Sequence, residues 1–151
     1  WSLIDVLSDE SASAFTPDVA ADAVQAHIVW QQSSSIRYTH GVNLNFATPI
    51  TLSTGTASAP TIAAITASTM AAAWDSGITL TLRVNNTGVW NSTLAFSVNP
   101  AGVGQPALSA GPNGAIYGAF TWGAGTRDIA FNAYSADVLL QPRLFLPLIV
   151  R

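Results

Sequence analysis

Apolar and polar residues alternate in several short stretches, a pattern typical of β-strands that bury one face. In the clearest stretch, 78–84, four apolar side chains (Ile78, Leu80, Leu82 and Val84) share one face. A turn at 85–88 and a second alternating stretch at 89–98 complete a predicted hairpin. Further strands are predicted at 41–46, 50–53, 115–122, 127–134 and 138–140. Short strands at this spacing predict an all-β fold, an antiparallel β-sandwich of jelly-roll or immunoglobulin-like type.

Three segments depart from this alternation. Thr16, Pro17 and Asp18 resemble a capped helix start and are followed by apolar residues at helical spacing, which predicts one short N-terminal helix over 17–32. Segment 61–74 is compatible with either a helix or a strand. The Gly- and Pro-rich stretch 99–114 is predicted to be a long loop.

Both termini are unusually apolar. Residues 1–7 are apolar at five positions and are followed by the hydrophilic stretch 8–11, so an extended N-terminal arm and linker is predicted over 1–15, with a single sandwich domain over 16–151. At the other end, six apolar residues lie between Arg143 and Arg151. Because burial of such residues is strongly favourable, each terminus is expected to dock, either on its own fold as an ordinary strand or on another copy.

Composition narrows the classes of function. Charged residues make up 9% of the chain and the net charge is −3, with five Arg and no Lys, so a nucleic-acid partner is not expected. The 49% of apolar residues argues against extended disorder. The apolar run 144–150 is far shorter than the ~20 residues of a spanning helix, so no membrane span is expected. A surface this poor in charge tolerates self-association.

No pattern of catalytic residues is evident. His27 and His40 lack the spacing of a metal or nucleophile site and are expected to be structural. The glycines of 102–107 lack the strand and helix context of a dinucleotide site. The sequence therefore predicts no enzyme activity, no cofactor and no metal.

Two features are compatible with glycans, either attached to the chain or bound by it. Asn85 and Asn91 stand in acceptor patterns, which chance alone would also produce in a chain with this many Asn. The five Trp could form a sugar-stacking platform, but Trp74, Trp90 and Trp122 lie in or beside predicted strands, where packing in the core is the commoner use of Trp.

The layout of an apolar arm, a hydrophilic linker and a charge-poor β-domain resembles subunits of prokaryotic extracellular filaments assembled by donor-strand complementation. The resemblance implies a pilus-like homopolymer, secreted to the cell surface, in which each copy donates a strand to the next. The tail is also similar to a short tail of exported proteins from filamentous phototrophic bacteria, which favours export.

The leading expectation is therefore a structural subunit of a self-assembling extracellular filament, with copies of itself and glycans as partners. The candidate donor strand comprises Trp1, Leu3, Ile4, Val6 and Leu7. The alternative docking tail comprises Leu144, Phe145, Leu146, Leu148, Ile149 and Val150. The alternative function is a secreted β-sandwich module that binds carbohydrate.

Overall fold

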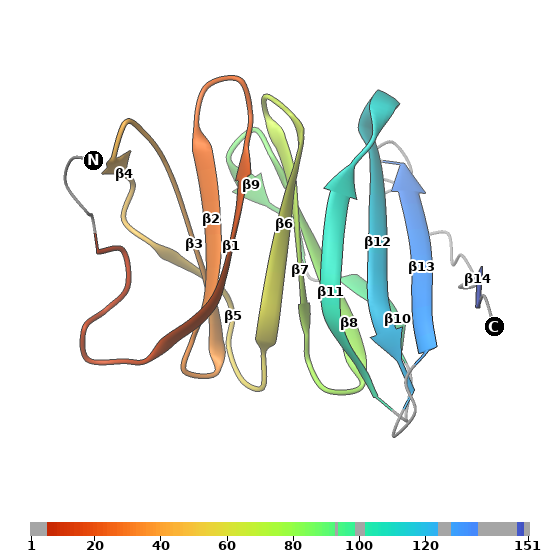
Figure 1. Cartoon of the computed structure of the whole chain (residues 1–151). Helices are drawn as coiled ribbons and strands as arrows, with labels where there is room; N and C mark the ends of the chain where they lie inside the picture. The colour runs from red at the N-terminus through yellow and green to blue at the C-terminus, as the bar shows by residue number, and fades with distance from the viewer. Residues whose placement is uncertain (1–5, 93, 99–101, 124–127, 136–147, 150–151) are drawn as a thin grey trace.

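The structure is a computed structural model that describes residues 6–92, 94–98, 102–123, 128–135 and 148–149 (Figure 1). These residues form fourteen strands and one short 3₁₀ turn. The strands are β1 (Ala14–Ala21), β2 (Ala26–Gln32), β3 (Ser35–Val42), β4 (Asn45–Phe46), β5 (Ile50–Ser53), β6 (Ser58–Thr66), β7 (Thr69–Asp75), β8 (Thr79–Asn86), β9 (Val89–Trp90), β10 (Leu94–Val98), β11 (Val103–Ala110), β12 (Ala115–Trp122), β13 (Asp128–Ser135) and β14 (Leu148–Ile149). The turn is η1 (Pro112–Gly114).

The strands form three antiparallel sheets, each built from consecutive strands. Sheet A contains β1 to β5, sheet B contains β6 to β10, and sheet C contains β11 to β14. In sheets A and B, two short strands share the fourth position, so that each sheet has the plan of a four-stranded meander. The sheets pack face to face, and the prediction of an all-β, antiparallel, sandwich-like fold is confirmed. Consecutive strands stay within one sheet in the described residues, whereas jelly-roll and immunoglobulin-like sandwiches distribute them over two sheets.

The predicted N-terminal helix over 17–32 is wrong. This segment forms β1 and β2, which pair from Ala14 with Gln32 to Ala21 with Ala26. The Asp22 side chain accepts hydrogen bonds from the backbone N–H groups of Val24 (2.6 Å) and Gln25 (2.8 Å), which closes a turn where the helix was expected to continue.

Two other expectations also fail. Segment 41–46 is not one strand, because Asn43 and Leu44 have φ angles of 50° and 68° and form the turn between β3 and β4. The expected loop 99–114 contains β11, whose glycines and proline are accommodated by a β-bulge between Gly104 and Ala107. The ambiguous segment 61–74 forms the hairpin of β6 and β7. The predicted strands 50–53 and 115–122 are confirmed.

The three sheets repeat the same local structure. Each first strand has a β-bulge at an X–Pro pair, and the residue before proline has a positive φ of 45° at Thr16, 47° at Ala59 and 49° at Gln105. The prolines that follow are Pro17, Pro60 and Pro106. In the second strand, the same register places a large aromatic residue in each sheet, and these residues are Trp30, Trp74 and Phe120. The chain is therefore a threefold repeat with a period of 43 to 46 residues.

The sheets lie closest together at their first strands. β6 contacts β1 on one side and β11 on the other, and Figure 1 shows β1, β6 and β11 side by side. The Thr61 hydroxyl donates to Asp18 Oδ2 (2.8 Å), which also accepts from the Ile62 N–H (2.9 Å). The Leu108 N–H in turn donates to Thr61 Oγ1 (3.2 Å). A single chain of hydrogen bonds thus joins the first strands of all three sheets.

Two apolar cores fill the two junctions between sheets. The core between sheets A and B includes Val29, Ile36 and Tyr38 on one side and Ile62, Ala72 and Trp74 on the other. The core between sheets B and C includes Leu80, Leu82 and Val84 on one side and Ile116, Phe120 and Ala130 on the other. Sheet B is therefore covered on both faces, and sheets A and C each have one covered face.

Candidate functional site

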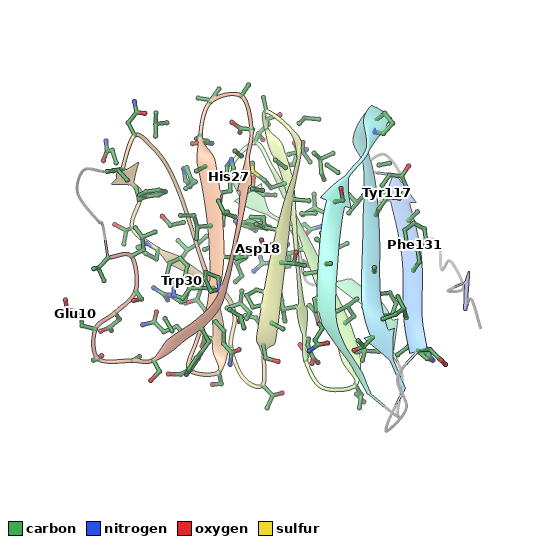
Figure 2. The ribbon with its side chains drawn as sticks, viewed as in Figure 1. Glu10, Asp18, His27, Trp30, Tyr117 and Phe131 are labelled. Atoms are coloured by element: carbon green, nitrogen blue, oxygen red, sulfur yellow. The ribbon has the colours of Figure 1, made fainter. Side chains whose placement is uncertain are left out.

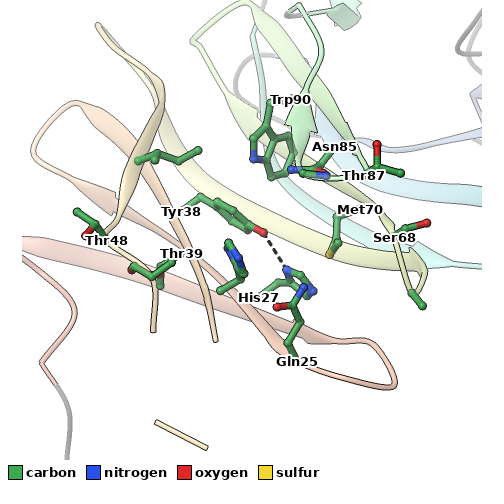
Figure 3. Close-up of a pocket in the computed structure, with 15 residues that line it drawn as sticks. Gln25, His27, Tyr38, Thr39, Thr48, Ser68, Met70, Asn85, Thr87 and Trp90 are labelled. Carbon is green, nitrogen blue, oxygen red and sulfur yellow. Dashed lines mark hydrogen bonds between the residues drawn. The ribbon is translucent and has the colours of Figure 1, made fainter. Parts of the chain in front are cut away.

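A cavity of about 410 Å³ lies at one end of the junction between sheets A and B. It is open to solvent and is lined by strand ends and turns of both sheets (Figure 3). Its aromatic residues are His27, Tyr38, His40 and Trp90. Its polar residues are Gln25, Thr39, Thr48, Ser68, Asn85 and Thr87, and the remaining lining residues are Ala47, Ile50, Ala67, Met70 and Gly88.

The aromatic residues form one continuous wall. The rings of Tyr38 and His40 stack with centroids 5.8 Å apart, and His27 stacks with both at 6.1 Å and 6.0 Å. Trp90 meets Tyr38 edge to face at 4.9 Å. His27 and His40 lie directly opposite each other on β2 and β3, so the sheet register itself places the rings in contact.

A buried hydrogen-bond chain supports this wall. Asp22 Oδ2 lies 3.1 Å from His27 Nε2, and Tyr38 Oη lies 2.8 Å from His27 Nδ1. An ionised carboxylate can only accept, so Nε2 carries the imidazole proton and Nδ1 accepts from the Tyr38 hydroxyl, the bond drawn in Figure 3. The chain fixes the orientation of both rings.

The three groups of this chain have shifted pKa values. Burial lowers the pKa of His27, although the Asp22 carboxylate partly opposes this effect. Burial, assisted by the Asp22 charge, raises the pKa of Tyr38 to about 12. Backbone hydrogen bonds from Val24 and Gln25 lower the pKa of Asp22. At neutral pH, His27 is therefore uncharged and Tyr38 keeps its proton, so both act as hydrogen-bonding groups and not as a charged or nucleophilic pair.

Arg83 and Asn85 hold the sheet B side of the cavity. Arg83 donates to the backbone oxygens of Asn91 (2.8 Å), Trp90 (3.4 Å) and Leu52 (2.9 Å), which ties the segment that carries Trp90 to sheet A. Asn85 Oδ1 accepts from the Gly88 N–H (2.9 Å) and closes the turn before β9. These bonds set the position of Trp90 relative to the rings of Tyr38, His27 and His40.

Among the described residues, the second junction has no equivalent of this wall. In register, Ala71, Leu82 and Val84 of sheet B correspond to His27, Tyr38 and His40 of sheet A, and all three pack in the core against sheet C. The repeat therefore packs with small and aliphatic residues at these places. The polar aromatic set between sheets A and B is an addition that packing of the repeat does not require.

The residues predicted as docking segments are partly described. Trp1, Leu3, Ile4, Leu144, Phe145, Leu146 and Val150 lie outside the described residues. Val6 and Leu7 line a groove of about 350 Å³ on the outer face of sheet A, together with Phe15, Pro17, Ile28 and Trp30. Leu148 and Ile149 form β14 and pair with Phe131 and Ala130 of β13.

The two candidate glycan acceptors serve the fold. Asn85 is buried, and the Asn91 side chain accepts from the Val84 N–H (2.8 Å). Of the candidate platform residues, Trp74 is fully buried in the core and Trp90 lines the cavity.

Sequence reasoning missed the cavity, because its wall depends on the pairing of β2 with β3. The signal that could have revealed it is the alternation of Tyr38 and His40 on one strand opposite His27 on its neighbour. Among the described residues, no three His, Cys, Asp or Glu side chains gather as metal ligands. That part of the chain also contains no helix with the length and apolarity needed to cross a membrane. Comparison with protein-family models, curated proteins and solved structures gives no match.

Proposed function

We propose that this protein is a binding module for a neutral carbohydrate, which occupies the cavity between sheets A and B. The observation that carries the proposal is the wall of Tyr38, His40 and Trp90, in which Tyr38 and His40 stand at places where sheet B has the aliphatic residues Leu82 and Val84. Sugar rings present apolar C–H faces that pack on aromatic rings, and hydroxyls that exchange hydrogen bonds with amides and hydroxyls.

The polar rim and the size of the cavity fit such a ligand. Gln25 and the hydroxyls of Thr48, Ser68 and Thr87 offer both donors and acceptors without a formal charge. The volume of about 410 Å³ falls in the ~300–1,000 Å³ range of small-molecule sites. The uncharged state of His27 and Tyr38 also favours a neutral ligand over an anion.

The test is calorimetric titration with glucose, galactose, N-acetylglucosamine, cellobiose and maltose. We expect saturable binding of at least one sugar, and about tenfold weaker binding by His40→Ala, which removes one ring of the wall. Val89→Ala is the matched control, because Val89 precedes Trp90 on the same strand but does not line the cavity. No binding of any of the five sugars at 10 mM, or equal affinity in His40→Ala, would refute the proposal.

A second candidate is the extracellular filament subunit. The observation in its favour is that Val6 and Leu7 lie in an apolar groove beside β1, the edge strand of sheet A. In a filament, the arm of one copy would occupy this groove on the next copy. We expect deletion of residues 1–8 to abolish filaments in negative-stain images, and the free peptide to bind the shortened protein one to one. Filaments that persist after the deletion would exclude the arm as the donated strand.

A further inference from the structure

The outer faces of sheets A and C expose residues that the repeat buries elsewhere. On sheet C, Ile129 and Phe131 are 63% and 44% exposed, whereas the corresponding Leu80 and Leu82 of sheet B are each 1% exposed. Tyr117 stacks on Phe131 with ring centroids 6.0 Å apart on this open face. Figure 2 shows Tyr117 and Phe131 together on sheet C, at the opposite end of the molecule from Trp30.

The open face of sheet A presents the complementary half of the same junction. Val19 is 62% exposed. Ile62, which stands at the corresponding position of sheet B, is 3% exposed because sheet A covers it. Phe15 and Ile28 extend this face beside Val19, and the groove described above borders it.

The two internal junctions show what covers each of these faces. Between sheets A and B, the face of sheet A with Ile36 and Tyr38 packs against the face of sheet B with Ile62 and Trp74. Between sheets B and C, Leu80 and Leu82, which have the places of Ile36 and Tyr38, pack against the face of sheet C with Phe120, which has the place of Trp74. The open face of sheet C carries Ile129 and Phe131 at the places of Leu80 and Leu82. The outer face of sheet A carries Val19 and Trp30 at the places of Ile62 and Trp74. A further sheet of the same repeat therefore fits each face, by continuation of an interface already present twice in the chain. On sheet A, the arm residues Val6 and Leu7 line the groove at Trp30, which is 4% exposed, so the arm must move aside where the further sheet packs.

We propose that two copies of this chain associate head to tail, sheet C of each copy packing on sheet A of the other, and close a ring of six sheets. Four-stranded meanders that converge on their first strands are the blades of β-propellers, which have typically 4 to 8 blades, and two copies supply six. A head-to-tail interface closes into a ring when the rotation between neighbours permits, and otherwise forms an open polymer.

The hydrogen-bond chain between first strands is compatible with this junction. Asp18 and Thr61 each accept from a backbone N–H of the following sheet, but Ala107 has the corresponding place in sheet C and cannot accept. The N–H that would lack this partner is that of Val19, and it already donates to Asp18 Oδ1 (2.9 Å). The intermolecular junction therefore does not leave the Val19 N–H without an acceptor.

The experiment is light scattering coupled to size-exclusion chromatography of the 151-residue chain at 10 to 200 μM. We expect a mass of twice 15.7 kDa. Ile129→Glu and Val19→Glu each place a carboxylate in the junction, and each should weaken the dimer at least about 100-fold. Both residues are largely exposed, so neither variant disturbs the core of a single copy. Val89→Glu is the control, since Val89 is 70% exposed on β9, away from both faces, and this variant should dimerise normally.

Mixing the two variants tests the head-to-tail arrangement. The copy with Val19→Glu keeps an intact sheet C, and the copy with Ile129→Glu keeps an intact sheet A, so the mixture should regain a dimer through one junction. A chain that stays monomeric at 200 μM, or a dimer unaffected by either variant, would overturn the proposal. Open oligomers that grow with concentration would overturn ring closure.

Deletion of residues 1–8 should leave the ring dimer intact, which separates this proposal from strand donation. Sugar binding is independent of these outcomes, because the cavity lies within one copy.

Discussion

Asp18 joins the first two sheets through a single carboxylate oxygen. That oxygen accepts from both Thr61 and the Ile62 N–H at the point where the sheets are closest. The Thr61 hydroxyl passes the connection on to Leu108 in sheet C. Loss of this carboxylate leaves these two donors without their acceptor in a half-buried place, and it also removes the acceptor of the exposed Val19 N–H.

We therefore predict that Asp18→Ala lowers the free energy of unfolding by about 1–3 kcal/mol. Asp18→Asn keeps one carbonyl oxygen at this place and should cost less. Urea unfolding followed by tryptophan fluorescence measures both values. An Asp18→Ala protein as stable as the unaltered chain would show that water satisfies the two donors.

His27 makes stability depend on pH. Burial lowers its pKa below the ordinary value of 6.5, so between these two values the unfolded chain binds more protons than the folded chain. Stability is then fully present above pH 6.5 and falls as the pH is lowered below it. The lowered pKa of Asp22 has its effect only below 3.8, a separate and more acidic range.

We predict that the thermal midpoint falls between pH 7 and pH 5 and that His27→Gln removes this slope. Differential scanning calorimetry at steps of half a pH unit measures the slope in both proteins. An equal slope in both would assign the effect to a different group.

The candidate site could be predicted from the sequence only in part. The sequence suggests a sugar platform only for the five Trp as a set, and one of them, Trp90, lines the cavity. The pairing of His27 with Tyr38 could not be predicted, because segment 17–32 was expected to be helical. Asp22 ends β1 by capping the turn, and this local bond competes successfully with the helical spacing of the apolar residues.

The second strands of the three sheets carry their largest side chains at one register position. Trp74 is fully buried between sheets A and B, and Phe120 is buried between sheets B and C. Trp30 faces the outer side of sheet A, where it lines the groove together with Val6 and Leu7 of the arm.

We predict that Trp74→Ala lowers the free energy of unfolding by about 3–5 kcal/mol, the cost of a large cavity in a packed core. Trp30→Ala should cost less, because a single arm segment can collapse into the space that a sheet would leave empty. Chemical denaturation of both variants measures the difference. Equal losses would mean that the arm packs as firmly as a sheet.

The strand pattern could be predicted better than the repeat. Alternation identified 50–53, 115–122 and much of β8, since apolar residues alternate with polar or small residues in these segments. It failed for β6, β7 and β11, which lie between two sheets or carry a bulge, so that alternation is lost. The prolines at 17, 60 and 106 mark the repeat in the sequence, but neighbouring residues differ too much for the period to be evident.

Across the whole molecule, protection from solvent decreases outward from sheet B. Five consecutive residues of β7 are buried, whereas β1 is mostly exposed and Ile129 of β13 faces solvent. Local opening therefore requires the least energy in the two outer sheets.

We predict that amide hydrogen exchange of a single copy is slowest in β7 and β8 and faster in β1 and β13. Mass spectrometry of peptides from Ile129→Glu, which stays monomeric under the ring proposal, measures this order. Equal protection of β1 and β7 would contradict it.

The assignment of consecutive strands to single sheets also has a consequence for synthesis on the ribosome. Sheet A can form before sheet B has been translated, and 43 residues separate Pro17 from Pro60. Translation proceeds at ~5–20 residues per second, so the core face of sheet A, with Val29, Ile36 and Tyr38, would stay exposed for about 2–9 s until sheet B is synthesised. During that interval the growing chain presents an unprotected apolar sheet, so it should need chaperones already before sheet B emerges.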